Sequence, residues 1–246
     1  MCLIIVKKKN VALDAAALFR SLEISSIKNN SGFGFAFKRD NQSFLSKGHK
    51  EVESLIEEIK KVGIRNKDEL IVHLRNPSPG TGSNISNSQL AHPFVVTSDV
   101  KLLYQKRAFT KLPIFAHNGK ISSFILPTYD PTSSDSFLFV KDVLSVPHMV
   151  EMMGYMYRKS NLKKLYNSLF DTNRFVIMKP NQSISLFGEW IEEKNLHYSN
   201  DSYKIVTRDT DDDDYSRHGL RSDHRLPFER LTSEKNLRSA RMCDTM

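Results

Sequence analysis

The sequence has few cysteines and no long apolar run. Only Cys2 and Cys243 occur in 246 residues, and without a C-x-x-C pair or a Cys/His cluster we expect no disulfide framework and no metal site. No stretch reaches the roughly 18 apolar residues of a transmembrane helix, and no secretory leader is recognisable. We therefore expect a cytoplasmic protein with reduced thiols and no membrane partner.

Basic residues outnumber acidic residues in most of the chain. The net charge is +8, but residues 207–246 hold eight Lys/Arg and nine Asp/Glu, so residues 1–206 carry a net charge of +9. A basic body can favour nucleic acid or other anionic partners. The lysines are scattered, however, and a run such as Lys7-Lys8-Lys9 is typical of a solvated surface. A nucleic-acid partner is therefore only weakly supported.

The last 40 residues differ in composition from the rest. They contain the acidic run Asp211-Asp212-Asp213-Asp214, then alternating charges and few apolar residues. Such a segment cannot bury enough surface to offset its chain entropy. We expect one domain over residues 1–206 and a flexible tail over 207–246. The alternative is a tail that becomes ordered on binding a partner. Cys243 lies in this tail and is not expected to be catalytic.

The body of the chain has a mixed α and β pattern. The aromatics Phe33, Phe35 and Phe37 recur at every second position, as on one face of a strand. Without regular βαβ alternation, the pattern predicts an α/β (α+β) fold of packed sheets flanked by helices. We expect strands at 2–6, 33–37, 70–74, 112–116, 120–126, 173–179 and 183–188, and helices at 12–24, 50–62, 134–144 and 147–169.

Cys2 is the first candidate for chemistry. Removal of Met1 would leave one residue with a thiol and a free α-amine, whose pKa is about 7.7–8.0. The thiol is a nucleophile and the amine a base near neutral pH, so Cys2 could supply both halves of a catalytic pair. The alternative is a buried cysteine that acts as a small apolar residue in a first strand.

Several polar clusters lie at the ends of apolar segments. Arg75 follows a strand and could bind a carboxylate with two hydrogen bonds, or could be an ordinary surface arginine. The pair Asn118-Gly119 could form an oxyanion hole, or could turn a hairpin. Asp135 could bind an ammonium group, or it or a neighbouring serine could cap a helix. His92 lies in a loop and could be structural.

Together and in order, these clusters resemble the glutaminase domain of class II glutamine amidotransferases, which belong to the N-terminal-nucleophile hydrolases. The resemblance covers about residues 2–200, and Phe187-Gly188-Glu189-Trp190 and Ser199-Asn200 add a weaker match. Its main motifs are Met1-Cys2, Gly32-Phe33-Gly34, His73-x-Arg75, the Ser78/Gly80 loop, His92-Pro93, His117-Asn118-Gly119 and Ser134-Asp135. The resemblance implies a four-layer α/β/β/α sandwich of the N-terminal-nucleophile hydrolase type.

The resemblance also implies a reaction. Cys2, freed of Met1, would attack the side-chain amide of glutamine with its own α-amine as base. Asn118 and Gly119 would stabilise the oxyanion. The products would be a glutamyl thioester and ammonia, and water would then release glutamate. The family needs no metal or organic cofactor for this reaction.

Four residues would bind the substrate under the same resemblance. Arg75 would hold the α-carboxylate of glutamine with help from Ser78, and Asp135 would hold the α-ammonium. His117 belongs to the same substrate-binding group.

The sequence departs from some relatives in the loop after Arg75. Amidophosphoribosyltransferase and glucosamine-6-phosphate synthase often have Trp-Ala-Thr-His-Gly there, whereas this chain has Asn-Pro-Ser-Pro-Gly over residues 76–80. No synthase domain is recognisable, so we expect ammonia to pass to a separate synthetase or transferase. Two alternatives stay open: an N-terminal-nucleophile amidohydrolase that acts on another amide, and a non-catalytic binding module of the same fold.

Overall fold

The computed structural model describes residues 1–76, 90–122, 125–127, 130 and 133–204. The chain divides into two units, Met1–Val206 and Thr207–Met246. The second unit, with Cys243 and the expected tail, lies outside the described residues. None of the helices in the described part of the chain is both long and apolar enough to cross a membrane.

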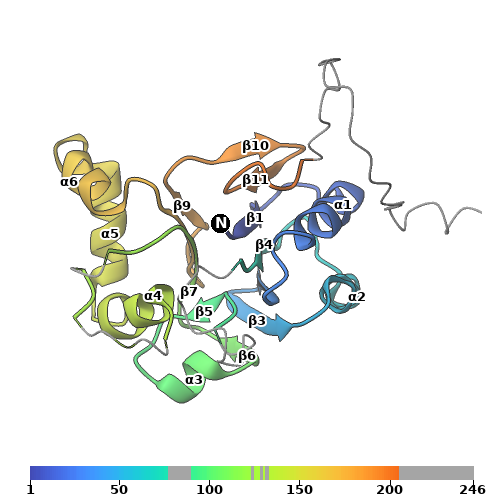
Figure 1. Cartoon of the computed structure of the whole chain (residues 1–246), viewed down its shortest axis with the longest axis horizontal. Coiled ribbons are helices and arrows are strands. Elements are labelled where there is room, and N and C mark those ends of the chain that lie inside the picture. Colours follow the sequence, from blue (N-terminus) through green and yellow to red (C-terminus); the bar gives the residue numbers. More distant parts are fainter. Residues whose placement is uncertain (77–89, 123–124, 128–129, 131–132, 205–246) are drawn as a thin grey trace, which may run out of the picture. The chain divides into compact units, whose positions relative to one another are not determined.

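The first unit contains two antiparallel sheets (Figure 1). The larger has the order β10-β11-β1-β4-β2-β3-β6 and the smaller the order β5-β7-β8-β9. The strands of the larger sheet are β1 (Leu3–Lys7), β2 (Phe33–Arg39), β3 (Gln42–His49), β4 (Glu69–Leu74), β6 (Arg107–Thr110), β10 (Ile191–Glu193) and β11 (Leu196–Tyr198). The strands of the smaller sheet are β5 (Phe94–Val95), β7 (Ile114–Asn118), β8 (Arg174–Met178) and β9 (Ser185–Phe187).

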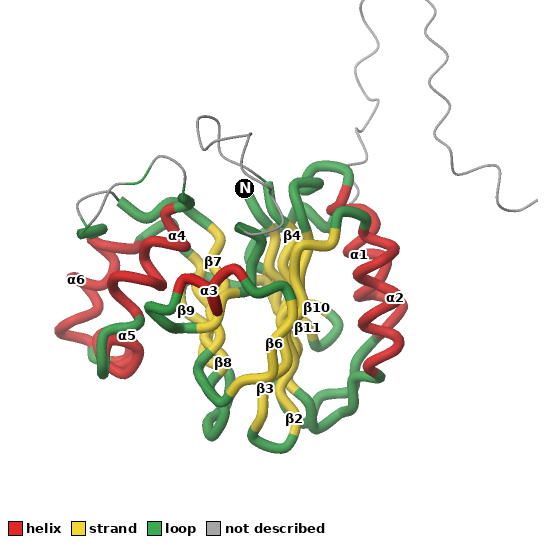
Figure 2. Tube along the Cα trace, turned by 90° about the horizontal axis from the view of Figure 1, so that it is seen from below, coloured by secondary structure: helices red, strands yellow, loops and turns green. Residues whose placement is uncertain are grey.

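Helices lie on the outer side of each sheet (Figure 2). The larger sheet is covered by α1 (Ala15–Ser26) and α2 (Val52–Val62). The smaller sheet packs against α3 (Val100–Tyr104), α4 (Asp135–Leu138), the π-helix η1 (Phe139–Leu144), α5 (Met149–Arg158) and α6 (Ser160–Phe170). The fold is therefore mixed α and β, as the sequence pattern predicted, and the strands of both sheets are antiparallel.

Alternation along the strands divides the apolar residues among three cores. Along β1, Leu3 and Ile5 face the helices α1 and α2, whereas Ile4 and Val6 face the smaller sheet. This is the period of two that a strand buried on both faces requires. Phe33, Phe35 and Phe37 all lie in the core beneath α1 and α2, so the expected common face of β2 is confirmed.

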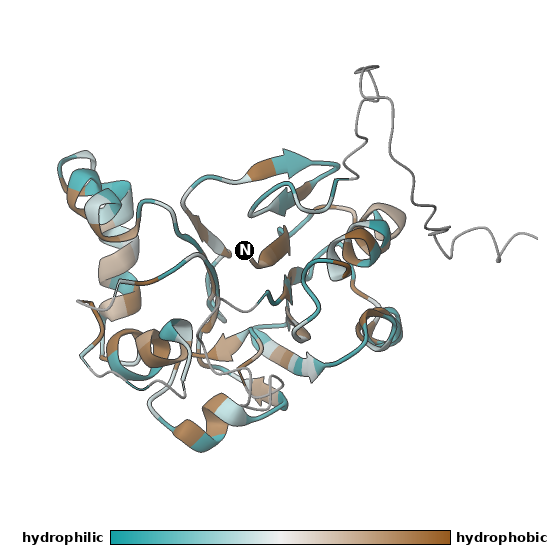
Figure 3. Cartoon of the chain, viewed as in Figure 1, coloured by the Kyte–Doolittle hydropathy of each residue, from teal (hydrophilic) through white to brown (hydrophobic). Residues whose placement is uncertain are grey.

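The outer helices bury one face each. In α2 the buried residues are Val52, Leu55, Ile56 and Ile59, which recur at the spacing of one helical face. Burial of each such side chain stabilises the fold by about 1.5–3 kcal/mol. Figure 3 shows apolar and polar residues side by side on the helices, as expected when only one face is covered.

A buried ion pair of the larger sheet holds the segment between β8 and β9, at the end of β4 remote from Arg75. Lys38 Nζ lies 2.6 Å from Glu69 Oε2 and also donates to the carbonyl oxygens of Lys179, at 2.9 Å, and Gln182. The Ile184 amide donates to Glu69 Oε1 at 2.9 Å. Because both charges are paired and hydrogen-bonded, their burial is tolerated. These contacts fix the position of the segment between β8 and β9 relative to β2 and β4.

Several predicted elements differ from the structure. The strand expected at 120–126 is absent from the described residues of that segment, 120–122 and 125–126. The described residues also contain no hairpin at Asn118-Gly119, which was the alternative prediction for this pair. Both edges of β7 are already paired, one with β5 and the other with β8. The helix expected over 147–169 is two helices, separated by the extended residue Lys159. The segment 134–144 begins as α4 and continues as η1.

Candidate active site

The candidate site lies where the ends of several strands meet. β1 and β4 are antiparallel with Leu3 opposite Leu74, so Cys2 and Arg75 lie at the same end of this strand pair. The Ser199 hydroxyl, just after β11, accepts from the Ile4 amide at 2.9 Å and contacts Asn118 Nδ2 at 2.9 Å. The topology thus brings together residues that are about 200 positions apart in the sequence.

Cys2 is held by contacts to its backbone and to its thiol. Asn200 Nδ2 donates to the Cys2 carbonyl oxygen at 2.7 Å, and the Asn76 amide lies 3.4 Å from Cys2 Sγ. Burial raises the pKa of the thiol, against the opposing effects of the Asn76 hydrogen bond and the positive charge of Arg75. A thiol with a raised pKa is mostly protonated at neutral pH, so it needs a base before it can attack.

Arg75 is a buried side chain, only 5% exposed. Its backbone is fixed by two hydrogen bonds of 3.0 Å, from its amide to the Gly32 carbonyl and from the Ser31 amide to its own carbonyl. Gly32 has a φ of 112°, which favours glycine in this turn. Burial lowers the pKa of the guanidinium, whereas the negative charges of Cys2 and Asp135 raise it. Arg75 is therefore not the ordinary surface arginine that the sequence left open.

Asp135 is the first residue of α4, and its carboxylate is held by backbone donors. The Ile121 amide donates to Oδ2 at 2.7 Å and the Ser136 amide donates to Oδ1 at 2.7 Å. The capping position belongs to Ser134, whose hydroxyl accepts from the Phe137 amide at 3.1 Å. The charge of Asp135 acts on Cys2, Arg75 and His117, so one fixed anion lies near one fixed cation and the thiol.

His117 is buried and engaged at both ring nitrogens. Nδ1 lies 2.7 Å from Ser136 Oγ and Nε2 lies 2.6 Å from Asn173 Oδ1. Because an amide oxygen only accepts, Nε2 carries the proton. The Ser136 hydroxyl lies between two acceptors, His117 Nδ1 and Asp135 Oδ1, the latter at 3.3 Å. Burial lowers the pKa of His117, so the ring is neutral. These contacts connect α4, β7 and the turn before β8.

Asn118 and Gly119 end β7 next to this histidine. Asn118 is buried, its Nδ2 contacts Ser199 Oγ, and no partner is recorded for its Oδ1. Gly119 has a φ of 145°, and a Cβ there would lie 2.3 Å from Asn173 Oδ1. Only glycine fits this position, because the Asn173 side chain that supports His117 occupies the space.

Two further buried histidines, His73 and His92, lie close to Arg75. His73 and His92 are in ring contact, with centroids 4.2 Å apart, and His73 Nε2 lies 3.2 Å from the His117 carbonyl oxygen. Burial lowers the pKa of His73 to about 3 and that of His92 well below its usual value. A Cβ on Gly34 would lie 2.2 Å from the His92 carbonyl oxygen. Glycine at position 34 therefore permits a close approach between the backbones of β2 and the His92 segment.

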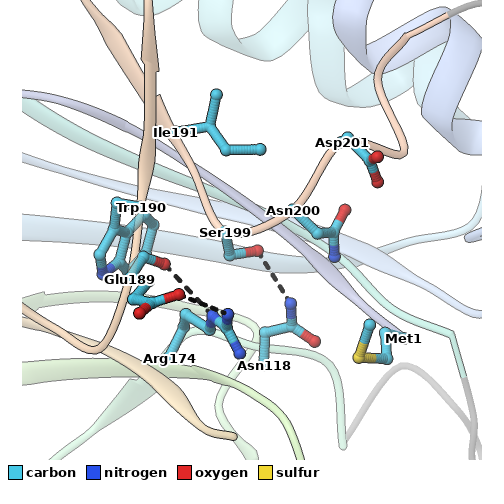
Figure 4. Close-up of a pocket in the computed structure, with 9 residues that line it drawn as sticks. All are labelled: Met1, Asn118, Arg174, Glu189, Trp190, Ile191, Ser199, Asn200 and Asp201. Carbon is cyan, nitrogen blue, oxygen red and sulfur yellow. Dashed lines mark hydrogen bonds and ion pairs between the residues drawn. The ribbon is translucent and has the colours of Figure 1, made fainter.

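A pocket of about 360 Å³ adjoins the start of β1 (Figure 4). We call it the Met1 pocket, because Met1 is one of its walls. Its lining residues are Met1, Asn118, Arg174, Glu189, Trp190, Ile191, Ser199, Asn200 and Asp201. The two segments that gave the weaker sequence match therefore meet here: Glu189 and Trp190 from one, Ser199 and Asn200 from the other.

The structure places six of the seven sequence-predicted residues in this region. Ser78 lies outside the described residues, together with Pro77, Pro79 and Gly80 of the same loop. Asn173 was not predicted, and its contacts to His117 and Gly119 have no signal in a single sequence. Among the residues that the structure describes, no group of three His, Cys, Asp or Glu side chains is placed to hold a metal ion. No protein-family model matches the chain, and no curated protein matches it.

Proposed function

We propose that this protein is a class II glutamine amidotransferase that hydrolyses the side-chain amide of glutamine. The observation that carries the proposal is the position of Cys2 beside Arg75 at the end of β4, with the charge of Asp135 acting on both. A thiol next to one fixed cation and one fixed anion suits a free amino acid, which is a zwitterion. The buried Arg75 and the backbone-held Asp135 are fixed before the substrate arrives.

The fold is consistent with this proposal. Two antiparallel sheets face each other across one core, and helices cover the outer face of each. We propose that this arrangement is the four-layer α/β/β/α sandwich of the N-terminal-nucleophile hydrolases. Cys2, the proposed nucleophile, directly precedes β1.

Loss of Met1 is the first step in the proposed mechanism. The raised pKa of the Cys2 thiol requires a base, and a free α-amine on Cys2, with a pKa of about 7.7–8.0, would supply one within the same residue. The sulfur attacks the amide carbon of glutamine while the amine takes the thiol proton. The protonated amine then gives its proton to the leaving nitrogen, ammonia departs, and water hydrolyses the thioester to glutamate.

Arg75 and Asp135 orient the substrate in this proposal. Arg75 binds the α-carboxylate and Asp135 binds the α-ammonium, so the side-chain amide points at Cys2. His117 is assigned a positioning role in place of direct substrate contact, because both of its ring nitrogens are engaged inside the protein. Its Nδ1 contacts the Ser136 hydroxyl, and its Nε2 contacts Asn173, the side chain that lies against Gly119.

Asn118 can supply one donor of the oxyanion hole once its amide is correctly oriented. Ser199 Oγ already accepts from the Ile4 amide, so its own proton is available for donation. A half-turn of the Asn118 amide lets Ser199 donate to Oδ1, which satisfies that buried acceptor, and directs Nδ2 into the Met1 pocket. The shape of the side chain does not change. The turn exchanges a buried acceptor without a partner for a donor that a substrate oxyanion can satisfy.

The products in this proposal are glutamate and ammonia, formed in the cytoplasm and with the ammonia used by a separate synthetase or transferase. A different N-terminal-nucleophile amidohydrolase is the alternative. The Arg75 and Asp135 pair favours glutamine, because an amide without a free amino acid head group has no use for both charges.

The test is a direct assay of the purified protein. Mass spectrometry should first establish that Met1 is absent, and the protein should then release equal amounts of glutamate and ammonia from glutamine. Asparagine is the matched control substrate, since it has the same head group and a shorter side chain, and it should be hydrolysed far more slowly. A protein that lacks Met1, is folded and releases no glutamate would contradict the proposal.

A further inference from the structure

The Met1 pocket adjoins the candidate active site, because Met1, the residue before Cys2, and Asn118 both line it. Met1 forms one wall, and the peptide bond after Met1 contains the nitrogen that becomes the α-amine of Cys2. Removal of Met1 therefore enlarges the pocket and places that amine at its edge. Asn118, the candidate oxyanion donor, lines the same pocket (Figure 4).

The chemistry fixes which part of a substrate faces this pocket. In the proposed mechanism the α-amine of Cys2 gives a proton to the leaving nitrogen, so the leaving nitrogen must lie beside the α-amine. The amino acid head group is held elsewhere, by Arg75 and Asp135, neither of which lines the pocket. The Met1 pocket is thus on the leaving-group side, and its volume of about 360 Å³ is far larger than ammonia needs.

The lining of the pocket suits an amine that bears a carboxylate. Arg174 brings a guanidinium, oriented by hydrogen bonds from Nε to the Glu189 carbonyl at 3.2 Å and from Nη1 to the Thr172 carbonyl at 2.8 Å. Its Nη2 lies 4.0 Å from Glu189 Oε2, at the limit of an ion pair, and the Glu189 side chain is 96% exposed. A ligand carboxylate can replace Glu189 as the partner of Arg174, because an exposed ion pair contributes little free energy.

Trp190 adds an apolar wall beside this arginine (Figure 4). Its indole Nε1 donates to the Phe187 carbonyl at 3.0 Å, which fixes the ring. A rigid aromatic wall and an oriented guanidinium together can bind a small side chain and a carboxylate, the two ends of an amino acid.

We propose that the Met1 pocket is a leaving-group subsite and that the enzyme cleaves γ-glutamyl amides of amino acids as well as glutamine. Arg174 binds the carboxylate of the leaving amino acid. This inference rests on the proposed function, since it uses the same nucleophile and the same head-group site, and it extends the substrate class from an unsubstituted amide to γ-glutamyl peptides.

The reaction balances without a further reactant. Cys2 Sγ forms a bond to the γ-carbonyl carbon of the glutamyl group, and the bond from that carbon to the nitrogen of the leaving amino acid breaks. The proton taken from the thiol passes through the α-amine to that nitrogen. Water then cleaves the thioester, so that one γ-glutamyl peptide and one water give glutamate and one free amino acid.

The first experiment compares three substrates on wild-type protein that lacks Met1. These are glutamine, γ-glutamylglycine and γ-glutamylglycinamide, the last two of which differ only in a carboxylate against a carboxamide. We expect γ-glutamylglycine to have a kcat/KM at least about tenfold above that of γ-glutamylglycinamide, because a carboxylate forms charge-assisted hydrogen bonds with the Arg174 guanidinium and a carboxamide does not. Equal values, or cleavage of glutamine alone, overturn the subsite and leave the glutaminase proposal intact. Cleavage of none of the three overturns the proposed function itself.

The second experiment uses Arg174→Gln with Arg20→Gln as the matched control, since Arg20 lies exposed on α1. The preference for γ-glutamylglycine over γ-glutamylglycinamide should fall to near one in Arg174→Gln and stay at the wild-type ratio in Arg20→Gln. Turnover of γ-glutamylglycinamide reports that the variant is folded. If Arg174→Gln does not fold, Arg174→Lys keeps the charge and should keep part of the preference. An undiminished ratio in Arg174→Gln overturns the assignment of Arg174.

Discussion

Under the proposed function, the choice of substrate depends most on the side chain of Arg75. Substitution Arg75→Ala removes the proposed partner of the α-carboxylate, and we expect KM for glutamine to rise at least about 100-fold, the equivalent of about 3 kcal/mol. Arg75→Lys should recover only part of this loss, because lysine cannot make two parallel hydrogen bonds. Steady-state kinetics measures both, with Arg20→Ala as a surface control. An unchanged KM in Arg75→Ala, in a variant with wild-type circular dichroism, would remove Arg75 from the site.

Asn118 should affect the rate more than the binding of substrate. An oxyanion donor acts on charge that develops in the transition state, so Asn118→Ala should lower kcat by about 10²–10³ with a nearly unchanged KM. Ser199→Ala should have a smaller effect, since Ser199 only orients the amide. A higher KM with unchanged kcat in Asn118→Ala would instead assign Asn118 to ground-state binding.

The resemblance gave Cys2, Arg75 and Asn118 their expected roles, and those roles stay predictions. The structure places these residues at neighbouring strand ends. The interactions of His117 were not predictable, because its partners Ser136 and Asn173 come from elements that meet only in the folded chain.

At the scale of elements, the end of β7 is the most constrained segment of the site. Gly119→Ala would force a Cβ to within 2.3 Å of Asn173 Oδ1 at a φ of 145°. We expect a loss of at least about 2 kcal/mol in the free energy of unfolding, and a lower kcat because His117 loses its Asn173 partner. Chemical denaturation and glutamate release measure the two effects.

Gly63 offers a matched control for this substitution. It also has a positive φ, of 62°, but no atom lies within 4 Å of the position of an added Cβ. Gly63→Ala should therefore cost only about 1 kcal/mol of backbone strain and leave kcat unchanged. Equal losses of stability in the two variants would show that the contact with Asn173 is unimportant.

Elements with a regular apolar pattern were predicted and irregular ones were not. The helix expected at 50–62 is α2, and the strand expected at 173–179 is β8. β3 was missed because it buries polar residues, including Ser43, Ser46 and Lys47. The strand expected at 120–126 was wrong because the Ile121 amide donates to Asp135 and not to another strand.

At the scale of the whole molecule, three buried histidines should make the fold sensitive to acid. Burial lowers the pKa values of His73, His92 and His117, whereas each takes a proton near pH 6.5 in the unfolded chain. Below that pH the unfolded state binds more protons, so stability falls as the pH falls. Each histidine that stays neutral in the folded state should lower the free energy of unfolding at pH 5 by about 2 kcal/mol relative to its value at high pH.

His92→Phe tests this account, because the ring stacks on His73 and Phe94 and neither ring nitrogen has a recorded hydrogen-bond partner. Phenylalanine keeps the ring contacts and cannot be protonated. Urea midpoints at pH 7 and pH 5 should differ less in the variant than in the wild type, by the equivalent of about 2 kcal/mol. The same pH dependence in both proteins would mean that His92 titrates normally in the folded state.

The mixed α and β class followed from the sequence because apolar periodicity reports on strands and helices directly. The antiparallel direction of the strands became known only from the structure. The order of the strands did not, since pairs such as β1 with β11 join segments almost 200 residues apart. Placement of the site at this meeting of strand ends required the structure.

The central claim is that Cys2, freed of Met1, is the nucleophile. The most direct measurement is the rate of glutamate release from glutamine by wild-type and Cys2→Ala proteins, both verified by mass spectrometry to lack Met1 and by circular dichroism to be folded. The wild type should release glutamate, and Cys2→Ala should release none above the uncatalysed background. Release by Cys2→Ala at the wild-type rate would contradict the mechanism.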